Sequence, residues 1–589
     1  MKISNKAASA ALAILIILSL AASCFFMSTK QGYHEDELLN YNLANSPDLL
    51  LEDSVKNALS NGTPLTPGDF KSYLSVSENH RFDYGMVYQN QIIDGVHPPF
   101  YYSLVNTACS FFPDTFNKWL GFTVNLVMMA AALVLLFRVG KRVTNNNLYA
   151  LIAAGGYALS IACVTTTIYL RMYATLTFFV LAFLAVTLRI YDRKNAVKIT
   201  DLILLLITVI PGVLTQYYFV VFAGLIGLVF LIFSIKDKNI KALVKYIITA
   251  VIGAGIALAI YPNMLMQVLG SDRGVGSTSS VSVDFITILT YVGYKLLTYA
   301  GVLAKDMFLG QIWLFALCAA CLLAAFVYFR FVKKQKTPRR AWFLIVPGVL
   351  YFIGIALISP FNSDRYVMAS MPMLSMVFVF GFIKIFNLIK NPKLHIILPV
   401  SIVLASAIGF AAVKPYYTYG TSNLYSPKTD DCLFVGTPMQ EWNKNLDKFM
   451  LYDTTTIVQT SMNIDGLVDE IEEFAQKRGV VTNGKIGGMV DSFIDSGSGK
   501  GDAESKENNL KTTTLETIKD NKTLARKDSI TVYISRLADN DAVIDYITKT
   551  LGFKNHTLVE ADKSFGDYFN WYDYFVETES YSNVYVFTK

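Results

Sequence analysis

Long uncharged apolar runs are the feature that most constrains how this 589-residue chain can fold. A helix needs about 20 apolar residues to cross a hydrocarbon core roughly 30 Å thick. The run at 202–235 is long enough for two crossings joined by a turn at Gln216-Tyr217-Tyr218. We therefore predict a polytopic α-helical membrane protein with about 11 spans, drawn from the runs 7–27, 119–137, 148–170, 172–188, 202–235, 246–266, 307–329, 341–361, 366–383 and 394–413.

The composition supports the same class of protein. Hydrophobic residues make up 53% of the chain and charged residues only 16%, whereas soluble domains are about a quarter charged. Basic residues cluster at the ends of apolar runs rather than on one face, so nucleic-acid binding is not indicated. The charge is uneven along the chain: residues 1–413 hold 32 Lys and Arg against 18 Asp and Glu, whereas residues 414–589 hold 19 against 27.

The basic clusters predict the orientation. Lys and Arg concentrate on the cytoplasmic side of membrane proteins. With eleven spans, the clusters that begin at Arg138, Arg189, Lys236, Arg330 and Lys384 fall on one side. We therefore expect a multi-pass plasma-membrane protein with a cytoplasmic N-terminus and an extracytoplasmic C-terminus.

Two segments are exceptions to a simple series of crossings. The run at 7–27 competes with a cleaved signal peptide, but its length favours a retained anchor. Segment 284–304 is amphipathic and has Lys295 at its centre. We expect it to be an external interfacial or re-entrant helix, because a lysine at mid-membrane is costly.

The chain is predicted to divide at residue 413. Residues 1–413 form the membrane domain, with a first external loop at 28–118. Residues 414–589 alternate strand-like and helix-like runs and predict an extracytoplasmic α/β domain with a flexible insertion near 496–529. The expected strands and helices of this domain are 432–436, 530–535 and 583–587, and 465–478 and 540–551.

Three consecutive carboxylates, Glu35, Asp36 and Glu37, follow the first apolar run. Charge at the mouth of a span costs free energy, so a cluster there is a candidate for chemistry. A carboxylate can take the proton from an attacking hydroxyl, and burial raises its basicity. The alternative is a solvated acidic turn. The same loop closes with His97-Pro98-Pro99-Phe100-Tyr101-Tyr102, where His97 either donates to a phosphate or only begins a helix.

Two arginines lie on the predicted external side, against the usual bias of cations. Arg171 begins a span, and Arg365 lies in a short loop beside Asp364. A guanidinium at this position either binds a phosphate or reaches lipid headgroups. Gln216 and Tyr217, at the turn of the double span, belong either to an aromatic belt or to the wall of a groove for a sugar lipid.

The order of these features resembles that of bacterial polytopic glycosyltransferases of the GT-C class, in particular the protein mannosyltransferase and aminoarabinose transferase group. The resemblance rests on Asp36-Glu37 after a first span, the run from His97 to Tyr102, Arg171-Met172-Tyr173-Ala174 at a later span, and Arg365-Tyr366 in a late external loop. It covers residues 1 to about 413 and does not specify the tail.

The resemblance implies an inverting transfer of a sugar from a polyprenyl-phosphate-linked donor to an acceptor hydroxyl outside the membrane. It implies that Asp36 is the catalytic base and that Glu37 orients the base or the acceptor. Arg171, Arg365 and His97 would bind the donor phosphate. The substrate groove would include Glu35, Tyr101, Tyr102, Tyr173, Gln216 and Tyr217. The sequence departs from the family pattern at Glu35, a third carboxylate, and at Gln216, where relatives often have histidine.

The expected partners are the membrane, the polyprenyl-phosphate sugar, and an acceptor that is a protein, a lipid or a glycan. No cofactor is implied, because the donor carries its own leaving group. A divalent metal bound by His34, Glu35 and Asp36 is an alternative that we do not favour. Two other functions remain open: a polytopic lipid or sugar transporter, and a non-catalytic membrane scaffold with a binding tail.

Overall fold

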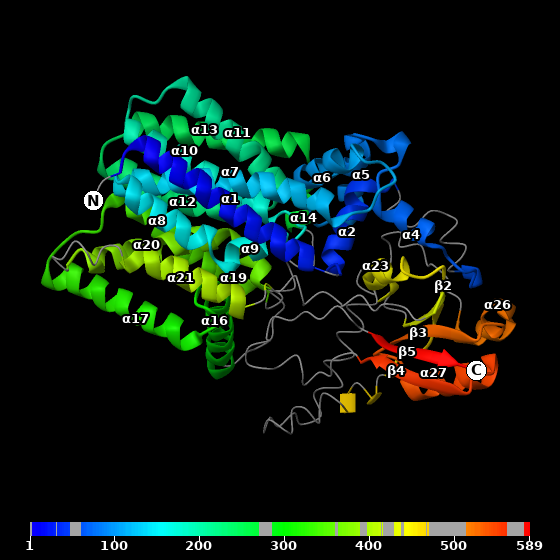
Figure 1. Ribbon diagram of the computed structural model, residues 1–589. Coiled ribbons are helices and arrows are strands. Elements are labelled where there is room, and N and C mark those ends of the chain that lie inside the picture. The colour runs from blue at the N-terminus through cyan, green and yellow to red at the C-terminus, as the bar shows by residue number, and fades with distance from the viewer. Residues whose placement is uncertain are drawn as a thin grey trace. The chain divides into compact units, whose positions relative to one another are not determined.

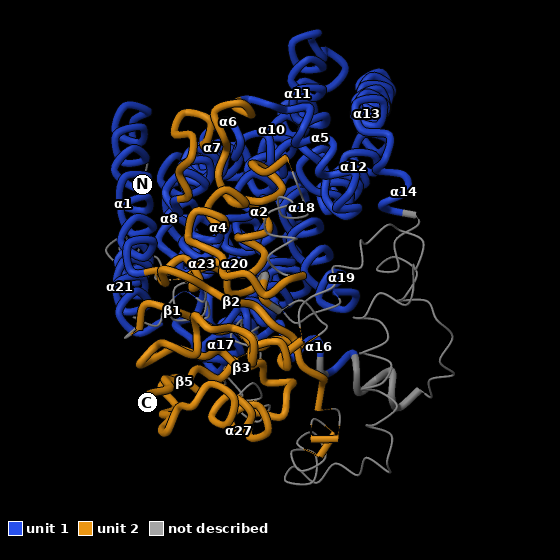
Figure 2. Tube along the Cα trace, turned by 90° about the vertical axis from the view of Figure 1, so that its right-hand side faces the viewer, with its two compact units in different colours: residues 1–29, 82–108, 117–418 blue, residues 30–81, 109–116, 419–589 orange. Residues whose placement is uncertain are grey.

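The computed structural model describes residues 3–30, 32–47, 60–269, 285–359, 363–388, 397–413, 415, 429–437, 441–463, 465–466, 468–469, 514–561 and 582–589 (Figure 1). Within these residues the chain forms two compact units (Figure 2). Unit 1 comprises residues 1–29, 82–108 and 117–418, and unit 2 comprises residues 30–81, 109–116 and 419–589. Most of the first predicted external loop therefore belongs to the unit that contains the tail.

Unit 1 is an assembly of apolar helices. Eight described helices are long and apolar enough to cross a membrane, and a bent pair makes a ninth. Together with the shorter apolar helices α11 (Ile199–Thr215) and α21 (Ile397–Ala412), they account for all eleven predicted spans. Large apolar side chains such as Ile207, Val251 and Leu323 are more than half exposed, as expected of surfaces that face lipid. The chain is a multi-pass membrane protein, as predicted.

These helices follow the predicted runs closely. Those of unit 1 that match the eleven runs are α1 (Asn5–Thr29), α7 (Lys118–Thr144), α8 (Asn147–Ala158), α9 (Ile161–Ile168), α10 (Tyr173–Arg193), α11 (Ile199–Thr215), α12 (Tyr218–Lys236), α13 (Ile240–Ile260), α17 (Ile312–Val327) with the π-turn η2 (Tyr328–Val332), α18 (Arg339–Ile345), η3 (Val346–Leu350), α19 (Tyr351–Ile358), α20 (Met371–Phe386) and α21 (Ile397–Ala412). The long run does divide at Gln216 and Tyr217.

One predicted span is broken. The run at 148–170 forms α8 and α9, which meet at an angle of 58°. Ser160 causes the break, because its hydroxyl accepts from the N–H of Cys163 and donates to the carbonyl of Tyr157. Such capping ends one helix and begins the next.

The remaining elements of unit 1 are short helices and one long helix. They are α5 (Tyr84–Asp94), α6 (Phe100–Ser110, whose last residues fall in unit 2), α14 (Met264–Leu269), α16 (Phe285–Met307), η4 (Asp364–Tyr366) and η5 (Met368–Ser370). The segment expected to be interfacial or re-entrant is thus one continuous helix, α16. Its Lys295 Nζ donates to the carbonyl of Ser359, which links α16 to the end of α19. Whether α16 lies in the membrane plane stays a prediction.

Unit 2 is built on a five-stranded mixed sheet, which confirms the predicted α/β class of the tail. Its strands are β1 (Asp431–Gly436), β2 (Thr454–Gln459), β3 (Ser529–Ser535), β4 (Asn555–Glu560) and β5 (Ser582–Thr588), in the order β2-β1-β3-β5-β4. β1 is parallel to β2 and β3, whereas β5 is antiparallel to β3 and β4. Its helices are α2 (Glu35–Asn45), α4 (Pro67–Leu74), η1 (Glu78–His80), η7 (Glu441–Asn445), α23 (Leu446–Phe449), η8 (Leu515–Asp520), α26 (Lys522–Ala525) and α27 (Asn540–Leu551).

The core of the sheet shows where the tail differs from expectation. The helix predicted at 540–551 is α27, and Gly552 ends it with a left-handed backbone (φ 74°). The helix predicted at 465–478 lies almost entirely outside the described residues. Within the insertion predicted at 496–529, residues 514–529 are ordered, and Leu515, Ile518 and Leu524 are buried in the sheet's core.

Candidate functional site

The acidic cluster of unit 2 forms the first turn of α2. His34 precedes the helix with an extended backbone, and its Nδ1 accepts from the N–H of Asp36 at 3.1 Å. In return, the Glu37 carboxylate accepts from the N–H of His34 at 2.8 Å. These reciprocal bonds form a capping box, and negative charge in a first turn also suits the helix dipole. Part of the cluster therefore serves the local fold.

The three carboxylates have different surroundings. Glu37 makes a 2.7 Å ion pair with Lys30, and both side chains are fully buried. Glu35 is 40% exposed and pairs with Lys444 at 3.1 Å. The Asp36 side chain is 23% exposed and lies 3.9 Å from the ring of His34. Glu37 is thus held by a lysine as well as by the cap, whereas Asp36 is partly exposed and lies beside the His34 ring.

In unit 1, a turn brings Asp94 and His97 together. Asp94 is the last residue of α5, and Gly95 ends that helix with a left-handed backbone (φ 68°). One Asp94 oxygen then accepts from the N–H groups of Val96 and His97 and lies 2.8 Å from His97 Nδ1. Burial alone would raise the pKa of Asp94, but its interactions with His97 and the charge of Arg171 lower it below its ordinary value.

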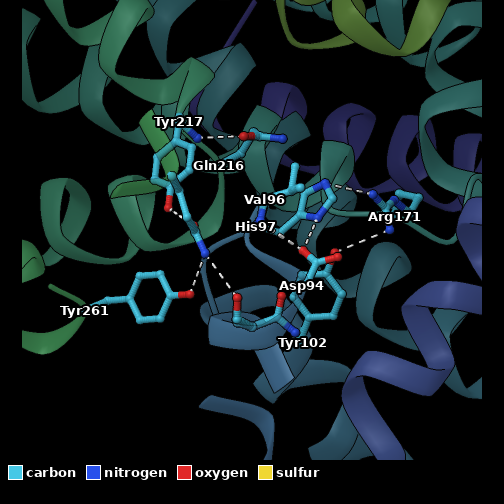
Figure 3. A network of polar contacts seen from close by, with 10 residues as sticks. Asp94, Val96, His97, Tyr102, Arg171, Gln216, Tyr217 and Tyr261 are labelled. Atoms are coloured by element: carbon cyan, nitrogen blue, oxygen red, sulfur yellow. Dashed lines mark hydrogen bonds and ion pairs between the residues drawn. The ribbon is translucent and has the colours of Figure 1, made fainter. Parts of the chain in front are cut away.

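Arg171 meets the other side of the same ring. Its guanidinium lies 3.0 Å from His97 Nε2, and it donates to the Tyr102 hydroxyl at 3.3 Å. Figure 3 shows the His97 ring between Asp94 and Arg171. Arg171 is only 3% exposed. A cation is thus buried in a shell of oriented polar groups, where its charge is poorly screened.

Hydrogen bonds from Asn125 of α7 fix the backbone next to Arg171. Arg171 lies in the short break between α9 and α10. There the Asn125 amide donates to the carbonyls of Thr167 at 3.1 Å and Tyr169 at 2.6 Å. The Tyr169 ring stacks on Tyr173, with centroids 5.7 Å apart. These contacts give the carbonyls at the end of α9 a donor and fix the backbone next to the guanidinium.

The predicted groove residues extend this network. Tyr101, fully buried, donates to Asn125 at 3.4 Å. Gln216 accepts from the N–H of Tyr217 at 2.7 Å, and the Tyr217 hydroxyl donates to Gln267. The Gln267 amide donates in turn to the Tyr261 hydroxyl at 2.7 Å and to the carbonyl of Gln91 at 3.0 Å (Figure 3).

Burial keeps the phenols of Tyr217 and Tyr261 neutral. It raises the pKa of Tyr217 well above its ordinary value and the pKa of Tyr261 to about 12. Both hydroxyls therefore remain able to donate at neutral pH. Neutral donors in a buried cluster suit sugar hydroxyls or phosphate oxygens better than a cationic ligand.

Arg365 is held by other neighbours. It lies in η4, is 9% exposed, and places its guanidinium 5.2 Å from the ring centre of Tyr366. The Tyr351 hydroxyl donates to the carbonyl of Tyr366 at 2.9 Å, which fixes this turn. A role of Arg365 at the donor phosphate stays a prediction.

Two buried amides lie next to these groups. Asn40 follows Asp36 by one turn of α2, and Gln91 precedes Asp94 by one turn of α5. Both are fully buried or nearly so, and within the described part of the chain neither side-chain amide has a hydrogen-bond partner. An unsatisfied buried amide costs about 1–3 kcal/mol, so each is a candidate contact for a polar ligand or a water molecule.

The structure therefore brings together some of the predicted site residues. His97, Tyr102 and Arg171 are in direct contact, and Tyr101, Tyr173, Gln216 and Tyr217 belong to the surrounding network. Glu35, Asp36 and Glu37 belong to unit 2, and their roles in chemistry stay predictions.

Sequence reasoning missed Asp94 and Gln267. An Asp followed directly by Gly and, two residues after the Gly, by His is a recognisable helix end in which the carboxylate can reach the imidazole. This spacing was therefore a signal for Asp94. Gln267 had no comparable local signal, because its partners come from distant parts of the chain.

The alternative metal site would use His34, Glu35 and Asp36 as ligands. In the structure His34 Nδ1 accepts a backbone N–H and Glu35 pairs with a lysine. Among the residues that the structure describes, no group of three or more His, Cys, Asp or Glu side chains is arranged to hold a metal ion.

Comparison with known proteins finds likenesses in fold. No protein-family model and no curated protein matches the sequence. Among solved structures, ArnT from Cupriavidus metallidurans bound to undecaprenyl phosphate has a TM-score of 0.46 at 10% identity, covering 98% of this chain and 97% of that one. The archaeal oligosaccharyltransferase AglB from Archaeoglobus fulgidus, in complex with an inhibitory peptide and a dolichol-phosphate, has a TM-score of 0.40 at 14% identity, covering 75% and 63%.

Proposed function

We propose that this protein is a membrane glycosyltransferase that moves a sugar from a polyprenyl-phosphate donor to an acceptor hydroxyl on the extracytoplasmic side, with inversion. The observation that carries the proposal is the buried guanidinium of Arg171, oriented by His97 and Tyr102. An ionised side chain is expensive to hold inside a membrane protein and usually marks a functional site. A guanidinium with fixed donors suits the phosphate of a lipid-linked sugar.

The phosphate site acts as the bond to the sugar breaks. When the acceptor oxygen attacks the anomeric carbon, the electron pair of the sugar–phosphate bond leaves with the phosphate. Arg171 and the neutral hydroxyl of Tyr102 would stabilise the charge that develops on that phosphate. Because Asp94 holds His97 and His97 contacts Arg171, these donors need little reorganisation.

The acceptor needs a base, and we assign this role to Asp36. Its carboxylate would take the hydroxyl proton as the new glycosidic bond forms. Glu37 is committed to the cap of α2 and to its ion pair with Lys30, so it would orient Asp36 by holding the helix. Asn40 lies one turn along the same helix and would bind a hydroxyl of the substrate.

Sugar transfer by the full-length protein in membranes tests this proposal. Labelled polyprenyl-phosphate sugars serve as donors, and the surface glycans of a deletion strain identify the missing sugar and its acceptor. Asp36→Asn should lower the rate by roughly a hundredfold to ten-thousandfold, whereas Glu78→Gln, at an exposed carboxylate of η1 in the same unit, should change it little. Wild-type rates in Asp36→Asn would reject Asp36 as the base. Unchanged surface glycans in the deletion strain, together with no transfer from any donor, would reject the transferase.

A further inference from the structure

A hollow of about 660 Å³ lies in unit 1 between α7, α10 and α11. It includes Arg189, which follows Arg171 by 18 residues along α10 and the turn before it. At 1.5 Å per residue these two arginines are roughly 27 Å apart, about the thickness of the hydrocarbon core. The hollow therefore opens near the membrane surface opposite to Arg171. Its volume is in the range of ordinary ligand pockets.

The rim of the hollow is strongly cationic. Five of its fifteen lining side chains are Lys or Arg, and only Asp192 is acidic. The two oxygens of Asp192 each accept from an arginine, Arg142 and Arg340, at 2.8 Å. Arg340 also donates to the carbonyl of Arg142 at 3.3 Å. One carboxylate thus holds two guanidinium groups side by side, and an excess of positive charge remains.

A similar pattern holds Arg189, another lining residue of the hollow. Asp201, fully buried at the start of α11, pairs with Arg189 at 2.7 Å and with Arg193 at 3.3 Å. Arginines that only follow the positive-inside bias have no need of such supports. Three lining arginines, Arg142, Arg189 and Arg340, are thus held by carboxylates and form a preorganised site for an anion.

The walls below the rim are apolar. Phe178, Ala182 and Val186 of α10 face the hollow together with Leu135 of α7 and Ile207 of α11. Phe178 lies eleven residues from Arg189, or roughly 16 Å along the helix. This depth is about half of the hydrocarbon core, the length available to one acyl chain in one leaflet.

We propose that the hollow binds an anionic phospholipid from the leaflet on the side of the N-terminus. The headgroup phosphate would lie against Arg138, Arg142 and Arg340, with one acyl chain along Phe178 and Val186. Basic pockets between membrane helices are typical sites for anionic lipids. Lys141, on the same rim, bonds Asn5, which places the N-terminus on this side. The site is separate from the proposed transfer chemistry and does not depend on it.

Lipid retention by the purified full-length protein tests the site. The protein is incubated in a neutral detergent with phosphatidylglycerol or phosphatidylcholine, and bound lipid is counted by native mass spectrometry. We expect a clear preference for phosphatidylglycerol. The double variant Arg138→Gln with Lys141→Gln should bind it about thirtyfold more weakly, since each basic residue near a surface contributes roughly a factor of five. The matched control, Lys241→Gln with Lys245→Gln, removes two exposed cations of α13 near the same surface and should bind normally.

A second variant separates a lipid from a soluble anion. Ala185→Phe narrows the apolar wall and leaves every charge in place, so it should also reduce lipid retention. Unchanged binding in Ala185→Phe, or full displacement by millimolar inorganic phosphate, would show a headgroup-sized anion site and overturn the lipid proposal. Equal binding of the two lipids, or equal losses in the charge variant and its control, would overturn it as well. Melting temperatures of all variants verify that they are folded.

Discussion

His97 and Arg171 share a contact of 3.0 Å that determines which ring nitrogen of His97 carries its proton. A guanidinium can only donate, so Nε2 of His97 accepts. Nδ1 therefore carries the proton and donates it to Asp94 at 2.8 Å. The ring is neutral in this arrangement. Because it bonds Asp94 on one side and Arg171 on the other, the position of Asp94 fixes that of the guanidinium.

Asp94→Asn should impair transfer without unfolding the protein. The amide keeps the shape but removes the charge that fixes the His97 ring, and losing one hydrogen bond to a charged group corresponds to roughly a ten- to hundredfold lower kcat/KM. Transfer assays across donor concentrations measure this. The matched control is Asp83→Asn at the opposite end of α5, where an amide caps the helix equally well. Equal effects of the two variants would contradict the assignment.

The pH dependence of the Asp94 interactions follows from its lowered pKa. A carboxyl whose pKa is lower in the folded than in the unfolded state stabilises the fold at pH values above its ordinary pKa. This stabilisation is lost as the pH falls through the pKa of the folded state. We therefore expect the contribution of Asp94 to stability and activity to stay constant between pH 5 and 8, and to be lost only below about pH 4. The ratio of wild-type to Asp94→Asn activity, measured over this range, should stay constant above pH 5.

Arg171→Lys tests whether the guanidinium acts through shape or only through charge. A lysine keeps the charge but cannot hold both His97 and Tyr102 in fixed directions. We expect a roughly tenfold lower transfer rate for Arg171→Lys and a hundred- to thousandfold lower rate for Arg171→Gln. Arg526→Lys, at an exposed position of unit 2, is the control. Full activity in Arg171→Gln would exclude a phosphate-binding role.

The apolar runs predicted the helices well because lipid leaves a chain few alternatives. Every run between 7 and 413 became one helix, or two helices where it bends or turns, and Gln216 and Tyr217 form the turn that divides the uncharged run of 34 residues at 202–235. The break at Ser160 was missed, since a serine inside an apolar run is usually compatible with a continuous helix. β2 and β4 were also missed, because their pairing depends on strands distant in the sequence.

The site was predictable only as separate motifs. His97, Tyr102 and Arg171 were each identifiable by residue type and by position at a span end, and the fold does place them in contact. Asn125 looked like one polar residue in an apolar helix, and its role depends on the tertiary packing of α7 against the α9–α10 break. The ion pair of Glu37 was not predicted, because its buried partner Lys30 lies seven residues earlier, before the helix begins.

Asn125→Leu should weaken both the fold and the function of unit 1. The leucine has a similar size but leaves the carbonyls of Thr167 and Tyr169 without this donor, at a cost of about 1–3 kcal/mol each. We expect a lower melting temperature and, in the molecules that remain folded, a lower transfer rate because the backbone at Arg171 relaxes. Thr123→Val on the same helix removes an exposed hydroxyl that bonds only its own helix and should change neither. Normal activity of folded Asn125→Leu would separate this residue from Arg171.

Glu37→Gln should destabilise unit 2 more than it affects chemistry. Removing one partner of a fully buried ion pair leaves the other charge uncompensated, which costs roughly 3–5 kcal/mol. The double variant Lys30→Met with Glu37→Gln should recover part of that loss, and a double-mutant cycle on thermal unfolding measures the coupling. If Glu37→Gln melts like the wild type yet loses transfer, Glu37 acts in the chemistry itself.

Asp447 should make the stability of unit 2 depend on pH in the opposite sense to Asp94. Burial raises the pKa of Asp447 to about 6, even though Lys448 and the N–H of Tyr33 oppose this rise. A carboxyl with a raised folded pKa favours folding while it is protonated, so the wild type loses stability as the pH rises from about 4 through 6. Asp447→Asn has no proton to lose. The difference between its free energy of unfolding and that of the wild type should therefore grow in favour of the variant by at most about 3 kcal/mol between pH 4.5 and 7.5.

Hydrogen exchange of the β1 amides in the full-length protein, compared at each pH, reports this difference in free energy. The exposed Asp453→Asn serves as the control, and an Asp447→Asn difference that is constant with pH would show that the buried carboxyl does not titrate in this range.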